Sequence, residues 1–178
     1  MAAYDPHVAE IRTIHIRRLG PHDLELARTT FAVMAEVFGE THAPLSDAYV
    51  AALLARPDFW GFAATHAGRV VGGLTAHTLM MTAYEGAEVF LYDIAVAPDQ
   101  QRRGIGRQLV DALRREACSQ GISTMFVPAD DDDPHALRFY AALGGKPSKV
   151  TLFEFSSPLS AGSNIPHRAV SARDGGDQ

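Results

Sequence analysis

The stretch that most constrains the fold is "QRRGIG", residues 101–106, which follows an apolar run and opens an amphipathic helix. The apolar face predicted for this helix consists of Ile105, Leu109, Ala112, Leu113 and Ala117, at helical spacing. The first turn of a helix exposes backbone N–H groups and carries a partial positive charge, so it can bind an anion. Gly104 and Gly106 remove side chains that would hold a phosphate away from those N–H groups.

Three arginines, Arg102, Arg103 and Arg107, surround the same point. Positive charge at a helix N-terminus opposes the helix dipole, which favours an anionic ligand that offsets it. The alternative is a solvated basic helix start with a glycine turn. A P-loop is excluded because Arg107 and Gln108 follow Gly106 in place of Lys and Ser or Thr. The dinucleotide motif G-x-G-x-x-G is excluded because residue 109 is leucine.

Hydrophobic periodicity and turn residues predict strands and helices along most of the chain. Strands are expected at 13–19, at 59–81 as a pair joined at Ala67-Gly68, and at 87–98, 123–130 and 150–156. Helices are expected at 24–38, 46–56, from 105 and at 134–143. Successive strands followed by alternating helices and strands indicate an α/β (α+β) chain with a mixed sheet and helices packed on it.

The 178 residues predict one domain at 14–157, with a flexible leader at 1–13 and a disordered tail at 158–178. The formal charge of −5 argues against nucleic acid as a partner and favours a cationic one. Cys118 is the single cysteine, so no internal disulfide can form. No apolar run approaches the roughly 20 residues that span a bilayer, and no signal peptide is recognisable, so we expect no membrane partner and a cytoplasmic location.

Several motifs together carry a family resemblance. The hexapeptide 101–106 fits the pattern Q/R-x-x-G-x-G/A, with "YDIAVAPDQ" before it and "ALRFYAALGG" after it. Over roughly residues 14–155 the chain resembles the GCN5-related N-acetyltransferase (GNAT) superfamily. Within that superfamily it resembles the aminoglycoside 3-N-acetyltransferases, through the strings "SDAYVAALL", "VVGGLTAHTL", "EVFLYDIAV" and "DDPHALRFYAALG".

The resemblance implies a mostly antiparallel central sheet with a splayed central strand, and acetyl-CoA as co-substrate. It implies that the backbone of Ile94, Ala95 and Val96 bonds the pantetheine arm and the acetyl carbonyl, with the N–H near Val96 as oxyanion donor. The pyrophosphate contacts are then expected from Gln101, Arg102, Arg103, Gly104, Ile105, Gly106 and Arg107. The resemblance also makes Tyr140 the candidate acid for the departing thiolate, whereas spacing alone favours a core aromatic.

Two carboxylates on the strand at 87–98 are candidate bases. Glu88 and Asp93 are five residues apart and would point to opposite faces of a regular strand unless a bulge intervenes. Asp93 lies between "FLY" and "IAV", so we expect it to be part-buried, either as the base or as a structural hydrogen-bond acceptor. Glu88 is expected nearer the surface, where it reaches substrate or a water.

The acidic run Asp130, Asp131, Asp132 and Asp133 precedes the helix predicted at Pro134. Asp133 fits a helix cap and its neighbours fit the helix dipole, which together account for one or two aspartates, not four. Like charges in series repel one another, so binding of a polycationic acceptor by this run is an equal alternative. Glu36, Glu40 and Asp47, around the two early helices, are weaker candidates for the opposite wall of the acceptor site.

These features favour transfer of an acetyl group from acetyl-CoA to an aminoglycoside amine, the 3-amino group, by direct attack in a ternary complex. Alternatives are a polyamine or a protein or peptide amine as acceptor, or a non-catalytic acetyl-CoA-binding sensor. The eight histidines form no metal-ligand spacing, so no metal is expected. Because the enzymes that the chain resembles commonly pair, the resemblance implies a homodimer.

Overall fold

The central feature of the fold is a five-stranded sheet with the strand order β1-β2-β3-β4-β5. The computed structural model describes residues 13–153 and residue 155. The strands are β1 (Ile14–Arg18), β2 (Phe59–His66), β3 (Arg69–Met80), β4 (Ala87–Val96) and β5 (Met125–Phe126). Neighbouring strands are antiparallel from β1 to β4, and β5 is parallel to β4. The mixed, mostly antiparallel sheet of an α+β fold is therefore confirmed.

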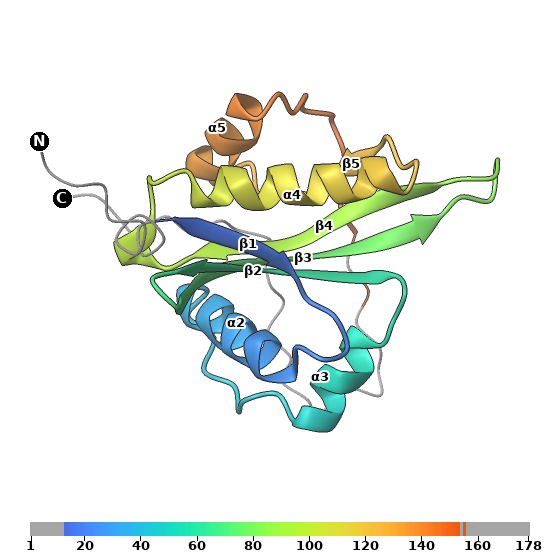
Figure 1. The fold of residues 1–178 in the computed structure, drawn as a ribbon. Coiled ribbons are helices and arrows are strands. Elements are labelled where there is room, and N and C mark those ends of the chain that lie inside the picture. The colour runs from blue at the N-terminus through green and yellow to red at the C-terminus, as the bar shows by residue number, and fades with distance from the viewer. Residues whose placement is uncertain (1–12, 154, 156–178) are drawn as a thin grey trace, which may run out of the picture. The chain divides into compact units, whose positions relative to one another are not determined.

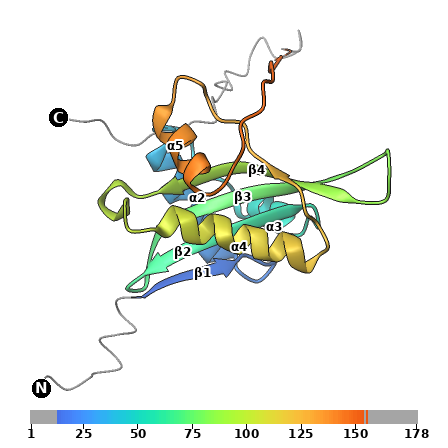
Figure 2. The same ribbon diagram turned by 90° about the horizontal axis from the view of Figure 1, so that it is seen from above.

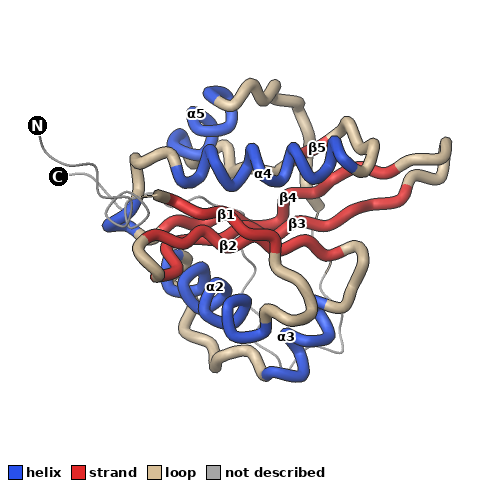
Figure 3. Tube along the Cα trace, in the orientation of Figure 1, coloured by secondary structure: helices blue, strands red, loops and turns tan. Residues whose placement is uncertain are grey.

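Helices cover both faces of this sheet. Figure 1 shows α2 (Leu24–Val37) and α3 (Asp47–Leu54) on one face and α4 (Ile105–Ser119) on the other. Figure 3 shows α2, α3 and α4 in blue on the two faces of the red sheet. The short 3₁₀ turn η1 (Pro98–Gln100) lies between β4 and α4. Residues 101–104 alone separate this turn from α4, so the helix N-terminus lies near the end of β4.

Local sequence explains why the elements begin and turn where they do. The Ser46 side chain accepts a hydrogen bond from the Tyr49 N–H at 3.2 Å, so Ser46 caps α3. Ala67 and Gly68 both have positive φ, 50° and 75°, which suits the tight turn predicted between β2 and β3. The β3–β4 hairpin runs on past β1 and β2 in Figures 1 and 2, and Leu79, Met80 and Tyr84 are exposed there.

The side of the sheet under α2 is closely packed at one glycine. A Cβ on Gly73 would lie 2.3 Å from Thr30 Cγ2 and 2.8 Å from Met34 Sδ. The last turns of α2 therefore lie directly on β3 at Gly73, whose neighbour in the β3–β4 register is Ala95. This contact brings the C-terminal end of α2 to the part of β4 that leads into the 101–106 turn.

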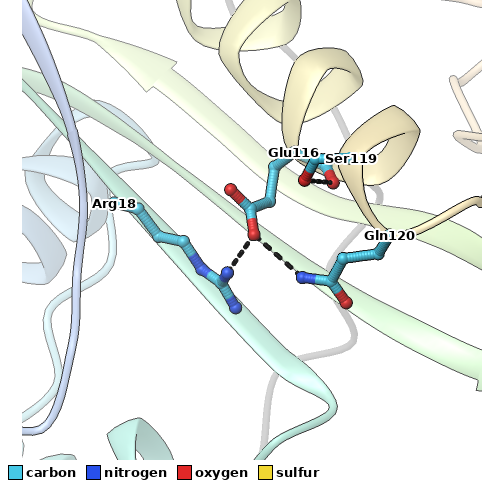
Figure 4. Close-up of polar contacts among 4 residues, drawn as sticks. All are labelled: Arg18, Glu116, Ser119 and Gln120. Atoms are coloured by element: carbon cyan, nitrogen blue, oxygen red, sulfur yellow. Dashed lines mark hydrogen bonds and ion pairs between the residues drawn. The ribbon is translucent and has the colours of Figure 1, made fainter.

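Side-chain contacts join the C-terminal half of α4 to the first two strands (Figure 4). Arg18 of β1 forms an ion pair with Glu116 of α4, and Gln120 Nε2 donates to the same carboxylate at 2.8 Å. The Arg18 guanidinium also lies 4.9 Å from the centre of the buried Trp60 ring. On its apolar face α4 buries Ile105, Leu109, Val110, Leu113 and Ala117 against the sheet, which agrees with the predicted face except that Val110 takes the place of Ala112.

Two expected strands differ in the structure. The strand expected at 123–130 is reduced to Met125–Phe126. The strand expected at 150–156 is wrong over its described part, because residues 150–153 are in no strand and Val150, Leu152 and Phe153 are exposed. Apolar alternation predicts a strand only where an unpaired edge is present to bond it.

The chain divides into two compact units, one ending at Val127 and the other beginning at Pro128. The second unit contains α5 (Pro134–Ala142). The expected tail at 158–178, and the expected leader except for Thr13, lie outside the described residues, so the boundaries at 14 and 157 stay predictions. Within the described part of the chain, no helix is both long and apolar enough to cross a membrane.

Candidate active site

The turn between β4 and α4 has the backbone conformation of a tight loop. Arg102 has a φ of 58° and Gly104 a φ of 78°, both in the left-handed region. A Cβ on Gly104 would meet no atom within 4 Å, so glycine is required there by the backbone rather than by crowding. The helix then begins at Ile105, with its first hydrogen bond from the Gln108 N–H to the Gly104 oxygen at 3.0 Å.

The N-terminus of α4 has no side-chain cap and no acidic residue in its first turn. The N–H groups of Ile105 and Gly106 precede the first helical bond, so they have no acceptor within the helix. By contrast, Asp133 caps α5 by accepting from His135 N and Ala136 N, each at 3.0 Å. Arg102, Arg103 and Arg107 are exposed around the uncapped turn. Its N–H groups, dipole and arginines suit a phosphate-bearing ligand.

The side chain of Gln101 contacts β4. Its Nε2 donates to the Val96 backbone oxygen at 3.1 Å, and the contact is part-buried. Sequence reasoning placed Gln101 among the pyrophosphate contacts, whereas its amide here joins the turn to the end of the strand. This hydrogen bond thus joins the loop that precedes α4 to the C-terminal end of β4.

On the side away from β3, the C-terminal half of β4 pairs with no strand among the described residues, so this edge is called open. The Ala97 N–H donates to Val71 at 2.8 Å, which makes this a hydrogen-bonded pair of the antiparallel ladder. By alternation, Ala95 also bonds β3, and the N–H and C=O groups of Ile94 and Val96 face away from it. On that side β5 pairs only with Val89 and Phe90 of β4. The splay expected beside β4 is therefore found in the structure. The N–H and C=O groups of Ile94 and Val96 face it.

A bulge in β4 changes which side chains share a face. Glu88 pairs with Leu79 and Asp93 with Thr75, so five steps along β4 match four along β3, with the shift between Thr75 and Ala76. Cross-strand partners point to the same face, so Glu88 and Asp93 both lie on the face that carries α2. The bulge that sequence reasoning left open thus brings the two candidate bases to one face. Asp93 is 9% exposed, and Glu88 is half-buried.

Aromatic rings accompany the bulge on the same face. His77 contacts Phe59 at 5.5 Å and Tyr92 at 5.8 Å between ring centres, and Tyr92 contacts Phe90 at 5.6 Å. Burial lowers the pKa of His77, and Arg56 lowers it further, while Asp58 acts in the opposite direction. Tyr92 is 45% exposed, so this row of rings reaches solvent next to Asp93.

The remaining candidates lie at the end of α2 and in the second unit. Glu36 is exposed and Glu40 half-buried, the latter just after the C-terminal end of α2. In the second unit, Asp130 Oδ1 accepts from Asp132 N at 3.0 Å. The Asp130 carboxylate thus stabilises the turn, and the Asp133 carboxylate caps α5. Asp131 and Asp132 are exposed. The half-buried Tyr140 ring packs against Phe139, with 5.1 Å between centres.

The uncapped, arginine-flanked helix start and the open β4 edge agree with a family assignment from sequence comparison. Residues 25–144 match the Acetyltransferase (GNAT) family. The chain belongs to the GNAT acetyltransferase family. This family uses acetyl-CoA. Among the described residues, no group of three His, Cys, Asp or Glu side chains could hold a metal ion.

Solved structures of other GNAT proteins have the same fold. An aminoglycoside acetyltransferase from an uncultured soil metagenomic sample is 31% identical, with a TM-score of 0.77 over 82% of this chain and 99% of that chain. A second one, solved in complex with sisomicin, is 28% identical, with a TM-score of 0.77 over 81% of this chain and 96% of that chain. The resemblance to aminoglycoside acetyltransferases is thus found among the structures.

A curated relative acts on a protein. The [ribosomal protein bS18]-alanine N-acetyltransferase of Salmonella typhimurium (strain LT2) is 39% identical over 57 residues, 32% of this chain. The matched part of this chain spans only 38% of the length of that relative.

Sequence reasoning missed Thr75, His77 and Tyr92 as neighbours of the candidate bases. Thr75 lies opposite Asp93 in the register of β3 and β4, His77 lies opposite Phe90, and Tyr92 is the bulge residue just before Asp93. The one available signal was the polar Thr75 and His77 in an otherwise apolar strand, and it does not reveal which residues of β4 they face.

Proposed function

We propose that this chain is an acetyltransferase that moves the acetyl group of acetyl-CoA to an amine of an aminoglycoside. The observation that carries the proposal is the uncapped N-terminus of α4 beside the open edge at Ile94 and Val96. The diphosphate of acetyl-CoA needs N–H donors such as those of the first turn of α4. Its amide-containing arm needs backbone partners such as those of Ile94 and Val96. One short turn joins the two sets of groups. The family match and the two metagenomic neighbours support the same reaction.

In this proposal the N–H groups of the first turn of α4 contact the pyrophosphate. Gly104 and Gly106 allow the close approach, and Arg102, Arg103 and Arg107 supply positive charge. The pantetheine arm pairs with the backbone of Ile94 and Val96. The backbone groups of Ala95 bond β3, so in this proposal Ala95 makes no hydrogen bond to the pantetheine arm.

Acetyl-CoA supplies an activated acetyl group as a thioester. The neutral amine nitrogen of the acceptor forms the new C–N bond to the acetyl carbon as the C–S bond breaks. The Val96 N–H is our candidate donor to the oxygen on which negative charge develops. Asp93 accepts the proton of the amine, directly or through a water shared with Glu88, and the Tyr140 hydroxyl protonates the departing thiolate. Neighbouring ammonium groups lower the pKa of the reacting amine, so a weak base suffices.

An acidic wall would hold the other amino groups of the acceptor. We assign Asp131 and Asp132 to it first, because the carboxylates of Asp130 and Asp133 already bond the local backbone. Glu36 and Glu40, at the end of α2, are the proposed opposite side. The 3-amino group remains our prediction for the position of acetylation.

A second candidate acceptor is the N-terminal amine of a protein. The identity to the ribosomal protein bS18 alanine acetyltransferase favours it. An N-terminal amine, unlike a polycationic aminoglycoside, needs no acidic wall in the acceptor site. A role of the acidic residues in acceptor binding therefore distinguishes the first candidate from the second.

The test is to identify the product formed from acetyl-CoA and sisomicin. Mass spectrometry should show the addition of one acetyl group, and NMR should locate it on the 3-amino nitrogen. Acetylation at another nitrogen would correct the position while retaining the activity. Acetylation of an alanine-initiated peptide, with no aminoglycoside product, would replace the first candidate by the second.

A further inference from the structure

A buried hydroxyl on β3 has no hydrogen-bond partner in the part of the chain that the structure describes. Thr75 is 7% exposed, and its Oγ1 has no hydrogen-bond partner among the described residues. An unsatisfied buried hydroxyl costs stability, and valine has almost the same shape and an equal preference for strands. The hydroxyl therefore needs an explanation other than packing.

Thr30 provides the contrast within the same protein. Thr30 is also fully buried and lies on the same face of the sheet, over Gly73. Its Oγ1 donates to the Leu26 oxygen in its own helix at 2.7 Å. Thr30 thus has a local use for its hydroxyl, whereas Thr75 has none in the part of the chain that the structure describes.

The residue opposite Thr75 is Asp93, the one charged side chain among the buried described residues. Alternation from the bonded pair of Val71 and Ala97 makes Thr75 and Asp93 a hydrogen-bonded pair of the ladder. Directly opposed residues have Cβ atoms about 4.5–5.5 Å apart, so a hydroxyl on one can bond a carboxylate on the other after rotation about χ1.

We propose that Thr75 is a positioning residue that donates its hydroxyl hydrogen bond to Asp93 during acetyl transfer. The inference rests on the proposed role of Asp93 as the base. Thr75 bonds one carboxylate oxygen and so directs the other toward the amine; the amine proton passes to Asp93 and then to solvent. The Thr75 hydroxyl keeps its own proton throughout. The tight bulge at Tyr92 fixes the pairing that makes this contact available.

Kinetics of Thr75→Val, Thr75→Ser and Thr30→Val test the proposal. Thr75→Val should lower kcat about tenfold, while the KM values for acetyl-CoA and for sisomicin stay within about twofold. Thr75→Ser should restore kcat, because it restores the hydroxyl. Thr30→Val, the matched control, should leave kcat unchanged. Wild-type kcat in Thr75→Val, or no recovery in Thr75→Ser, would overturn the proposal.

Two further measurements separate this proposal from the one on which it rests. In denaturant unfolding without ligands, Thr75→Val should have the same or a higher midpoint than the wild type, since it loses no bond. A clearly lower midpoint would show that the hydroxyl already has a structural partner and would contradict us. If Asp93→Asn keeps full turnover, the role of Asp93 fails; if Asp93→Asn is inactive and Thr75→Val is fully active, Thr75 alone fails.

Discussion

Gln101 donates a hydrogen bond of 3.1 Å from Nε2 to the backbone oxygen of Val96. Val96 belongs to the open edge of β4, and Gln101 opens the turn that leads into α4. One side chain therefore sets the spacing between the backbone groups that we assign to the pantetheine arm and those that we assign to the pyrophosphate.

Replacing Gln101 by alanine should loosen this spacing. Loss of one part-buried hydrogen bond costs about 1 kcal/mol, so we expect the KM for acetyl-CoA to rise roughly five- to tenfold. Steady-state kinetics with varied acetyl-CoA measure it. Gln100→Ala is the control, because the Gln100 side chain bonds Asp99 and Arg103 at the surface rather than the backbone of β4. Equal KM values for the two variants would argue against a spacing role.

Gly104→Ala should separate backbone strain from cofactor binding. With a φ of 78°, an alanine there costs about 1–2 kcal/mol of unfolding free energy. Gly68→Ala, at a φ of 75° and equally uncrowded, should cost about the same. We expect weaker acetyl-CoA binding by calorimetry only for Gly104→Ala, since the strain there distorts the phosphate turn. Equal affinities in the two variants would remove the turn from the binding site.

The sequence predicted this helix start well because its signals are local. Glycine conformation and helical spacing depend on a few neighbouring residues. The shared face of Glu88 and Asp93 depends on one extra residue in β4 relative to β3, which no pattern within either strand reveals. Over its described residues, the strand expected at 150–156 is absent for a related reason, since a strand needs a partner edge that only the fold supplies.

The stability of the protein should depend on pH through His77. Because burial lowers its pKa, the unfolded chain binds more protons near pH 6.5 than the folded one. Unfolding free energy should therefore fall as the pH drops below about 6.5. Denaturant curves at pH 7.5 and pH 5.5 measure the fall, and His77→Phe should reduce it. The same fall in the variant would assign the effect to other groups.

Tyr140→Phe should slow turnover without changing cofactor affinity. If the hydroxyl protonates the thiolate, kcat should fall at least about tenfold, with the KM for acetyl-CoA nearly unchanged. Tyr84→Phe is the control, because Tyr84 is 59% exposed on the β3–β4 hairpin and has no proposed role. Unchanged kcat in Tyr140→Phe would mean that the ring serves packing and that the thiolate takes its proton from elsewhere.

The most direct test of the account is thiol release from acetyl-CoA, measured side by side with sisomicin, spermidine and an alanine-initiated peptide. We predict that kcat/KM for sisomicin exceeds that for either other amine by at least about tenfold. Turnover with the peptide alone would contradict the proposed acceptor. No turnover with any of the three would contradict the proposed reaction itself.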